Sequence, residues 1–227
     1  MRRKLRTWAL YLKEHFLEYP APNLEGTRDV ENSWIAAQMP EGPGYALDFG
    51  CGTSSLGLLA ARRNFIVTAI DLCPILHPFS HERFTFYTKD LLSTTLPPVF
   101  FSLIINCSSV EHVGLERYGS RKVEDGDIFA MRKLWGITKV GGIMLLTTVV
   151  GRECTVANLH RVYGKERLDR LLQGWRILNS EWWTKNERNQ WVESGEAAAF
   201  AVEPSDHYYG LFLAKLQKDK AGFGEVE

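Results

Sequence analysis

Short apolar runs alternate with helix-like segments through the first two thirds of the chain, and this alternation restricts the fold more than any other feature. Five runs have the length and apolar content of buried strands: residues 45–49, 65–70, 84–87, 99–106 and 143–150. Apolar residues recur at helical spacing over 54–63 and 127–138. This alternation is typical of a parallel, doubly wound sheet. Adding a helix over 163–172 and strands over 175–183 and 208–216, we predict an α/β fold with a mostly parallel, seven-stranded sheet.

Two further helices are predicted before the first strand. Apolar residues at helical spacing indicate a helix over 5–19, which Pro20 and Pro22 end, and another over 27–39. In the second helix, the predicted apolar side consists of Val30, Trp34 and Ile35. We expect residues 1–40 to form a helical cap. A single domain over 1–227 is expected, because 45% of the residues are apolar and no Pro/Gly/Ser-rich linker divides the chain.

Charge and cysteine spacing exclude several classes of function. The 27 basic and 27 acidic residues leave no net charge, which argues against nucleic acid as a partner. The four cysteines form no CxxC pair, so neither a zinc site nor a disulfide framework is predicted. No apolar run approaches the roughly 20 residues that a membrane span needs. A cytoplasmic protein is therefore expected.

A glycine-rich turn over residues 50–53 follows the first predicted strand and opens a helix. Gly50 and Gly52 can adopt positive φ and let a ligand approach the backbone, while the start of the helix offers N–H groups. Asp71 follows roughly 20 residues later at the end of the next strand, where a carboxylate can accept hydrogen bonds from both hydroxyls of a ribose. The turn and Asp71 together predict a nucleoside site.

Two residues favour one kind of nucleoside over another. The fingerprint for NAD requires a third glycine, and this chain has Ser55 at that position. Asp48, directly before the turn, would repel a pyrophosphate but suits a ligand that carries an ammonium group. The first hypothesis is therefore a protein that binds an aminoacyl nucleoside, and the second is an NAD(P)-dependent oxidoreductase.

The order of these segments resembles the successive motifs of class I S-adenosylmethionine-dependent methyltransferases, which have a Rossmann-like fold. The matching segments are residues 46–54, 70–72, 89–91, 102–109 and 140–148. The resemblance makes 44–150 the cofactor-binding half and 151–227 the acceptor side with the closing strands. One departure is Ser102, which stands where the fourth motif often begins with an acidic residue.

The resemblance also implies which residues bind S-adenosylmethionine and its product S-adenosylhomocysteine. These are Asp48 near the amino end, the loop residues Gly50, Cys51, Gly52 and Thr53, Asp71 at the ribose, Leu72 beside the adenine, Asp90 with Leu91 at the adenine amino group, and Asn106, Cys107 and Ser108 beside the methionine and sulfonium.

Candidate residues for the chemistry follow the fourth strand. Glu111-His112-Val113 resembles the corresponding segment of methyltransferases that act on small molecules, including hydroxyl groups of quinones and sugars. His112 is the candidate base, because imidazole exchanges protons near neutral pH; the alternative is that Glu111 and His112 only begin a helix. No metal site is predicted, since no further carboxylate lies at suitable spacing. The candidate acceptor pocket consists of Glu111, Arg117, Tyr118, His160 and Tyr163.

These observations predict a methyltransferase of class EC 2.1.1.- that transfers a methyl group to an oxygen or nitrogen of a small-molecule or glycan acceptor. Two alternatives stay open. One is the NAD(P)-dependent oxidoreductase, and the other is a non-catalytic protein that binds S-adenosylmethionine without turnover.

Overall fold

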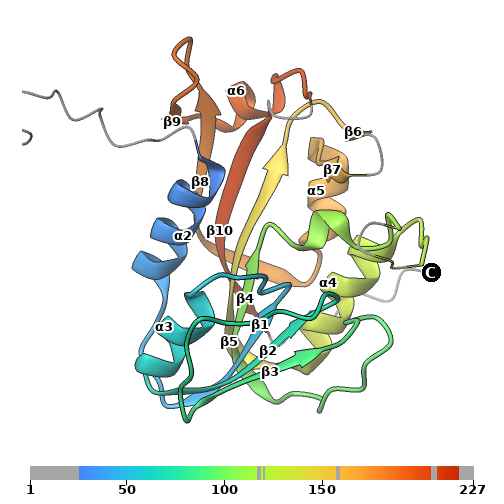
Figure 1. Cartoon of the computed structure of the whole chain (residues 1–227). Helices are drawn as coiled ribbons and strands as arrows, with labels where there is room; N and C mark the ends of the chain where they lie inside the picture. The colour runs from blue at the N-terminus through green and yellow to red at the C-terminus, as the bar shows by residue number, and fades with distance from the viewer. Residues whose placement is uncertain (1–25, 117–118, 120, 157–158, 206–208, 220–227) are drawn as a thin grey trace, which may run out of the picture.

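The structure is a computed structural model, and it describes residues 26–116, 119, 121–156, 159–205 and 209–219 (Figure 1). The helix predicted over 5–19 lies outside these residues. No helix in the described part of the chain is long and apolar enough to cross a membrane.

One twisted sheet runs through the molecule, and its order is β3-β2-β1-β4-β5-β10-β8-β9. Its strands are β1 (Gly44–Phe49), β2 (Phe65–Asp71), β3 (Phe84–Thr88), β4 (Phe101–Cys107), β5 (Thr138–Val150), β8 (Trp175–Lys185), β9 (Trp191–Ser194) and β10 (Gly210–Lys218). The strands from β3 to β5 are parallel. Strand β10 is antiparallel to both β5 and β8. The doubly wound α/β fold is therefore confirmed.

The sheet has eight strands where the sequence analysis predicted seven. The additional strand is β9, which forms a hairpin with the end of β8. Its turn is stabilised by Asn186, whose Oδ1 accepts hydrogen bonds from the N–H groups of Arg188 and Gln190. Trp191 at the start of β9 is buried and fixes the hairpin against the core. Polar turn residues dominate this segment, so its apolar pattern was too weak to predict a strand.

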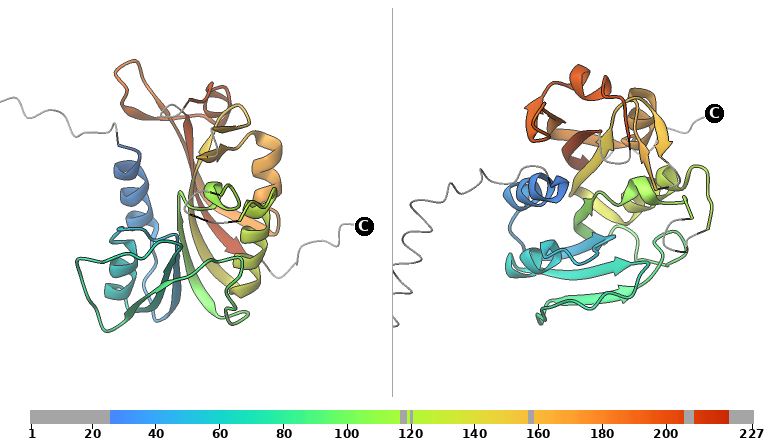
Figure 2. Two further views of the ribbon diagram at one scale, coloured as in Figure 1. Left: turned by 45° about the vertical axis from the view of Figure 1, so that its right-hand side comes forward. Right: turned by 45° about the horizontal axis from the view of Figure 1, so that its top comes forward.

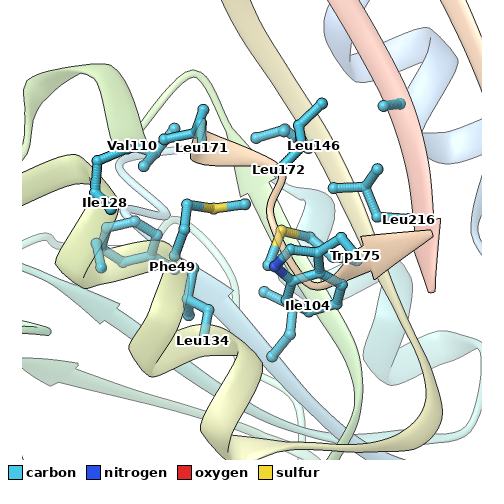
Figure 3. Close-up of a cluster of buried hydrophobic side chains, with 14 of the residues drawn as sticks. Phe49, Ile104, Val110, Ile128, Leu134, Leu146, Leu171, Leu172, Trp175 and Leu216 are labelled. Carbon is cyan, nitrogen blue, oxygen red and sulfur yellow. The ribbon is translucent and has the colours of Figure 1, made fainter. Parts of the chain in front are cut away.

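Helices cover both faces of the sheet, as Figure 2 shows. They are α2 (Thr27–Gln38), α3 (Leu56–Arg62), α4 (Gly126–Ile137), α5 (Lys165–Leu171) and the short α6 (Glu196–Phe200). Helices α2 and α3 pack on one face, where they share a core with β1, β2 and β4. Helices α4 and α5 pack on the other. Figure 3 shows this second core, in which Ile128 and Leu134 of α4 lie near Phe49 of β1. The helices predicted over 27–39, 54–63, 127–138 and 163–172 are confirmed.

Strand order reverses between β1 and β4, and this reversal decides where a ligand can bind. On one side of the switch the strands follow in the order β1, β2, β3, and on the other side in the order β4, β5. The carboxyl ends of all five lie at the same edge of the sheet. Loops that leave a parallel sheet at such a switch diverge and open a crevice. A 3₁₀ turn, η1 (Val110–His112), follows β4 at this edge, and a small hairpin of β6 (Cys154–Val156) and β7 (His160–Val162) follows β5.

Candidate functional site

A pocket of about 700 Å³ opens at the carboxyl ends of β1 to β4. Several predicted site residues line it together: the cofactor-binding candidates Gly50, Gly52, Asp71, Leu72, Asp90, Leu91 and Ser108, and the candidate base His112. They come from four different segments of the chain, and the switch in strand order brings them to one cavity. This volume lies in the usual range for a pocket that holds a small molecule or cofactor.

The glycine turn is held tightly against its neighbours. Gly50 has φ +64°, and its N–H donates to the carbonyl of Ile70 at 2.9 Å. A Cβ atom at Gly50 would lie 2.4 Å from Oγ of Ser109, so a side chain there cannot be accommodated without movement. Gly52 also has positive φ, +49°, and lines the pocket. The turn therefore presents bare backbone to whatever the pocket holds.

Asp71 links the glycine turn to the end of β2. Its Oδ2 accepts a hydrogen bond from the N–H of Gly52 at 2.9 Å, and its Oδ1 accepts one from the N–H of Cys73 at 2.9 Å. Each carboxylate oxygen can accept two hydrogen bonds, so both keep acceptor capacity on the pocket side. Asp90 is fixed similarly, since its Oδ1 accepts from the N–H of Leu92 at 2.9 Å. Two oriented carboxylates therefore line one end of the pocket.

Asp48, in contrast, does not line the pocket. Its side chain is 2% exposed and points from β1 toward α3, where a Cβ atom at Gly57 would lie 2.8 Å from its Oδ2. Alternate residues of a strand face opposite sides of the sheet, and this alternation turns Asp48 away from the cavity. Burial raises the pKa of this carboxyl to about 7, with a further contribution from the negative charge of Asp71. We expected Asp48 near the amino end of the cofactor; the structure places it beneath the turn.

Several other predicted residues also lie outside the pocket lining: Cys51, Thr53, Asn106, Cys107, Glu111, His160 and Tyr163. Thr53 is exposed, and Asn106 is buried with its amide nitrogen 3.8 Å from the sulfur of Met131. Tyr163 is fully buried in the core, where burial and the nearby Asp127 carboxylate raise the pKa of its hydroxyl well above the usual value. Arg117 and Tyr118 lie outside the described residues.

His112 lines the pocket, and a contact of its ring nitrogen Nδ1 orients the imidazole. Its Nδ1 lies 2.6 Å from the carbonyl oxygen of Leu159. A carbonyl can only accept a hydrogen bond, so Nδ1 carries the proton and the neutral ring has its basic lone pair on Nε2. The ring of His160 packs edge-on with a centroid distance of 6.2 Å, and His160 in turn contacts Tyr209. These contacts fix the plane of the His112 imidazole.

A polar group that the sequence analysis missed lies next to this end of the pocket. Arg28 of α2 lines the cavity, and its Nη1 donates to Oε2 of Glu31 at 3.0 Å and to the carbonyl of Cys107 at 3.2 Å. Glu31 is fully buried. A signal for it exists in the sequence, because Glu31 lies three and four residues before Trp34 and Ile35 and therefore shares their buried face.

Glu111 is a second buried carboxyl in the same region. It is 1% exposed, and its Oε2 accepts a hydrogen bond from the hydroxyl of Thr148 at 3.2 Å. Burial raises the pKa of Glu111 to about 7, against the opposing effect of the nearby Arg28 charge. Burial also raises the pKa of Glu31, which Glu111 repels and Arg28 attracts. Two carboxyls thus share one guanidinium behind the pocket wall.

The loop between η1 and α4 forms another wall of the pocket, through Val113, Gly114, Gly119, Arg121 and Val123. Gly114 has φ +81°, and a Cβ atom there would lie 2.2 Å from the carbonyl oxygen of Val123, so the two ends of the loop are in close contact.

Arg161 of β7 anchors this loop from behind. Its side chain is 5% exposed, and its guanidinium donates to the carbonyls of Val113 at 2.6 Å and Glu124 at 2.9 Å. It also lies 3.7 Å from the buried carboxylate of Asp127, which Arg167 contacts as well. Arg161 lies between His160 and Tyr163, which were predicted for the acceptor pocket, but its guanidinium anchors the wall from behind. Among the described residues, no three His, Cys, Asp or Glu side chains are placed to hold a metal ion.

Comparison of the sequence with known families and proteins gives two kinds of match. The model of the family described as "Caenorhabditis protein of unknown function, DUF268" matches residues 98–216, about half of the chain. A relative from Mycobacterium tuberculosis, "Uncharacterized methyltransferase Rv0089", is 27% identical over 121 residues, which cover 51% of this chain and 56% of that protein. The chain spans about half the length of the relatives it matches, from 47% to 56%.

Solved structures with similar folds include methyltransferases and an enzyme named for another reaction. The 1,6-didemethyltoxoflavin-N1-methyltransferase of Burkholderia thailandensis, solved with its substrate and S-adenosylhomocysteine, covers 95% of this chain and 88% of its own, with a TM-score of 0.56 and 13% identity. The N-methyltransferase NodS of Bradyrhizobium japonicum, with S-adenosylhomocysteine, covers 87% and 89% with a TM-score of 0.57 and 14% identity. The [4+2]-cyclase SpnF covers 85% and 82% with a TM-score of 0.59 and 20% identity. The class I methyltransferase fold is thereby established.

Proposed function

The chain belongs to the family described as "Caenorhabditis protein of unknown function, DUF268". From its class I methyltransferase fold and its similarity to relatives named methyltransferases, we propose that it is an S-adenosylmethionine-dependent methyltransferase. One observation supports the proposal most directly. The bare backbone of Gly50 and Gly52 and the carboxylates of Asp71 and Asp90 line a single pocket at the switch in strand order. This arrangement suits a ligand with an amino acid at one end and a nucleoside at the other.

The residues present fit this cofactor. A Cβ atom at Gly52 would meet no protein atom within 4 Å, so the turn leaves room there for a ligand that approaches the backbone closely. Asp71 would accept hydrogen bonds from the ribose hydroxyls, and Asp90 would accept one from the adenine amino group. Leu72 and Leu91 would contact the adenine faces. Asp48 would not contact the cofactor and would influence its binding only indirectly, as a buried carboxyl beneath the glycine turn.

Arg28 complements the other end of the cofactor. It is the pocket-lining cation that contacts the end of β4, through its bond to the carbonyl of Cys107. Guanidinium pairs with carboxylate in a planar, bidentate geometry. We assign Arg28 to the carboxylate of the methionine part, while the carboxylates of Asp71 and Asp90 would face the nucleoside.

The acceptor would be a small molecule or glycan with an oxygen or nitrogen nucleophile. When bound, S-adenosylmethionine supplies an electrophilic methyl group on a sulfonium. The chain's own contribution is to hold the nucleophile in line with that group and to remove its proton. His112, with Nδ1–H fixed by Leu159 and Nε2 as the basic atom, is the candidate for the second task.

Binding measurements and a product assay test the proposal against its rivals. In calorimetry, the protein should bind S-adenosylmethionine and S-adenosylhomocysteine and should bind neither NAD nor NADP. Formation of S-adenosylhomocysteine should then be followed over a panel of small hydroxylated, amino and glycan acceptors. Binding of NAD(P) alone would favour the oxidoreductase, and cofactor binding without turnover would favour the non-catalytic protein. The assay is needed because SpnF shows that this fold also occurs in a cyclase.

Replacing His112 should lower turnover without affecting cofactor binding. We expect His112→Ala to reduce kcat by about 10²–10⁴-fold, the usual contribution of a general base, while the Kd for S-adenosylmethionine changes less than twofold. His112→Asn can keep the donor to the Leu159 carbonyl but has no basic nitrogen, so it should lose as much activity. His81→Ala is the matched control, because His81 does not line the pocket. Unchanged turnover in both His112 variants would remove the base assignment.

A further inference from the structure

Glu31 connects the helix α2 to the ends of two central strands. Its carboxylate is fully buried and accepts hydrogen bonds from three side chains. Nη1 of Arg28, one turn earlier on α2, donates to Oε2 at 3.0 Å. The hydroxyl of Thr147 in β5 donates to Oε1 at 2.8 Å, and the hydroxyl of Ser108 after β4 donates to the same oxygen. Two of these three donors, Arg28 and Ser108, line the pocket.

Ser108 is held in an unusual backbone conformation at this point. Its φ is +43°, a region that residues with a side chain rarely adopt. Its N–H donates to the carbonyl of Thr147 at 3.0 Å and lies 3.1 Å from the Thr147 hydroxyl. Such a conformation persists only where its surroundings determine it, and it is common at ligand sites. Glu31 is among those surroundings, because it fixes the hydroxyl of the same residue.

The orientation of Arg28 also depends on Glu31. The Arg28 side chain is 57% exposed, so packing alone does not fix it. Its Nη1 is held by Glu31 Oε2 and by the carbonyl and sulfur of Cys107. Among the described residues, no acceptor is bonded to its Nε or Nη2. An anchored Nη1 with unused donors on the same planar group is an arrangement that can receive a carboxylate.

The burial of Glu31 argues against a purely structural role for this residue. A buried carboxylate is costly unless it is paired and hydrogen-bonded, and an apolar residue would pack at least as well. The neighbouring Glu111 adds repulsion to that cost. A purely structural role is therefore a poor account of Glu31.

We propose that Glu31 is a positioning residue, which fixes the Arg28 guanidinium and the Ser108 hydroxyl on the pocket wall so that Arg28 can bind the carboxylate of the amino-acid part of the cofactor. This role rests on the proposed function. It differs from a general contribution to stability, because it concerns one group of the ligand. The affinity for a cofactor that lacks this carboxylate should not change when Glu31 is replaced.

Decarboxylated S-adenosylmethionine provides the test, since it retains the sulfonium, amine and nucleoside. Glu31→Gln, which cannot form the charged pair with Arg28, should raise the Kd for S-adenosylmethionine roughly tenfold to a hundredfold. The Kd for the decarboxylated compound should stay within about twofold of its wild-type value. Arg28→Met should give the same selective loss, and adding Glu31→Gln to it should cause little more, because the two residues act as a unit. Asp29→Asn, an exposed acid on the same helix, is the matched control.

The possible outcomes separate the two proposals. Equal weakening of both compounds by Glu31→Gln, or no weakening of either, would overturn the positioning role. If Glu31→Gln does not fold, Glu31→Asp decides the question, because it keeps the charge but withdraws it by one methylene and should show part of the same selectivity. Failure of the wild-type protein to bind either compound would instead overturn the proposed function.

Discussion

Asp71→Ala is expected to raise the Kd for S-adenosylmethionine about 10- to 150-fold, which corresponds to roughly 1.5–3 kcal/mol of lost binding free energy. The carboxylate is held at the pocket wall by the N–H groups of Gly52 and Cys73, so it is already oriented before a ligand arrives. Two ribose hydroxyls that had bonded to an ionised acceptor would lose it together. Titration calorimetry with S-adenosylmethionine and S-adenosylhomocysteine measures the change.

Asp71→Asn should weaken binding as well, although it preserves the shape of the side chain. Both oxygens of Asp71 accept a backbone N–H, so the NH₂ group of asparagine must face a donor whichever way it turns. Asp169→Ala, on an exposed acid of α5, serves as the control. Melting temperatures measured without ligand separate loss of the pocket from loss of the fold. An unchanged Kd in a folded Asp71→Ala protein would remove Asp71 from the cofactor site.

Arg161→Met should lower the free energy of unfolding by about 3 kcal/mol. Methionine can fill the space of the arginine stem but cannot donate to the carbonyls of Val113 and Glu124. It also removes one of the two guanidinium groups next to the fully buried Asp127. Urea denaturation measures the loss of stability.

The same variant should affect the pocket, because the loop that Arg161 anchors forms part of its wall. We expect weaker binding of S-adenosylmethionine even at temperatures where the variant is folded. Arg170→Met is the control: its side chain is 56% exposed and pairs with Asp125 at the surface, so it should cost less than about 1 kcal/mol. Similar losses in the two variants would mean that the buried position of Arg161 has no special importance.

Local patterns were sufficient to predict the sheet and which strand ends lie together. Strand β4 is buried over almost its whole length, and its unbroken apolar run indicated a central parallel strand. Residues 50–53 and Asp71 each stand at a strand end, and parallel strands bring their carboxyl ends together. The predicted strand boundaries therefore almost determined which residues would lie close together at this edge of the sheet. Strand β9 was missed because a polar hairpin carries little apolar periodicity.

Contacts between distant segments could not be predicted in this way. Glu31 is hydrogen-bonded to Ser108 and Thr147, which lie 77 and 116 residues away in the sequence, and no local sequence pattern predicts these contacts. Arg161 lies close to the predicted acceptor pocket in sequence, yet three-dimensional packing directs its guanidinium into the back of a loop. Asp48 was predicted from its motif position, while the pleat of β1 turns its side chain to the other face of the sheet.

Cutting the chain where the family match begins, at residue 98, would leave strand β4 without its neighbour β1. The strand would keep its apolar side chains but present a row of unpaired N–H and C=O groups in the middle of what had been a continuous sheet. Exposed edges of this kind recruit strands from other molecules and lead to aggregation. A recombinant fragment of residues 98–216 is therefore expected to associate with itself, because the matched segment holds only part of a continuous sheet whose other part carries the glycine turn.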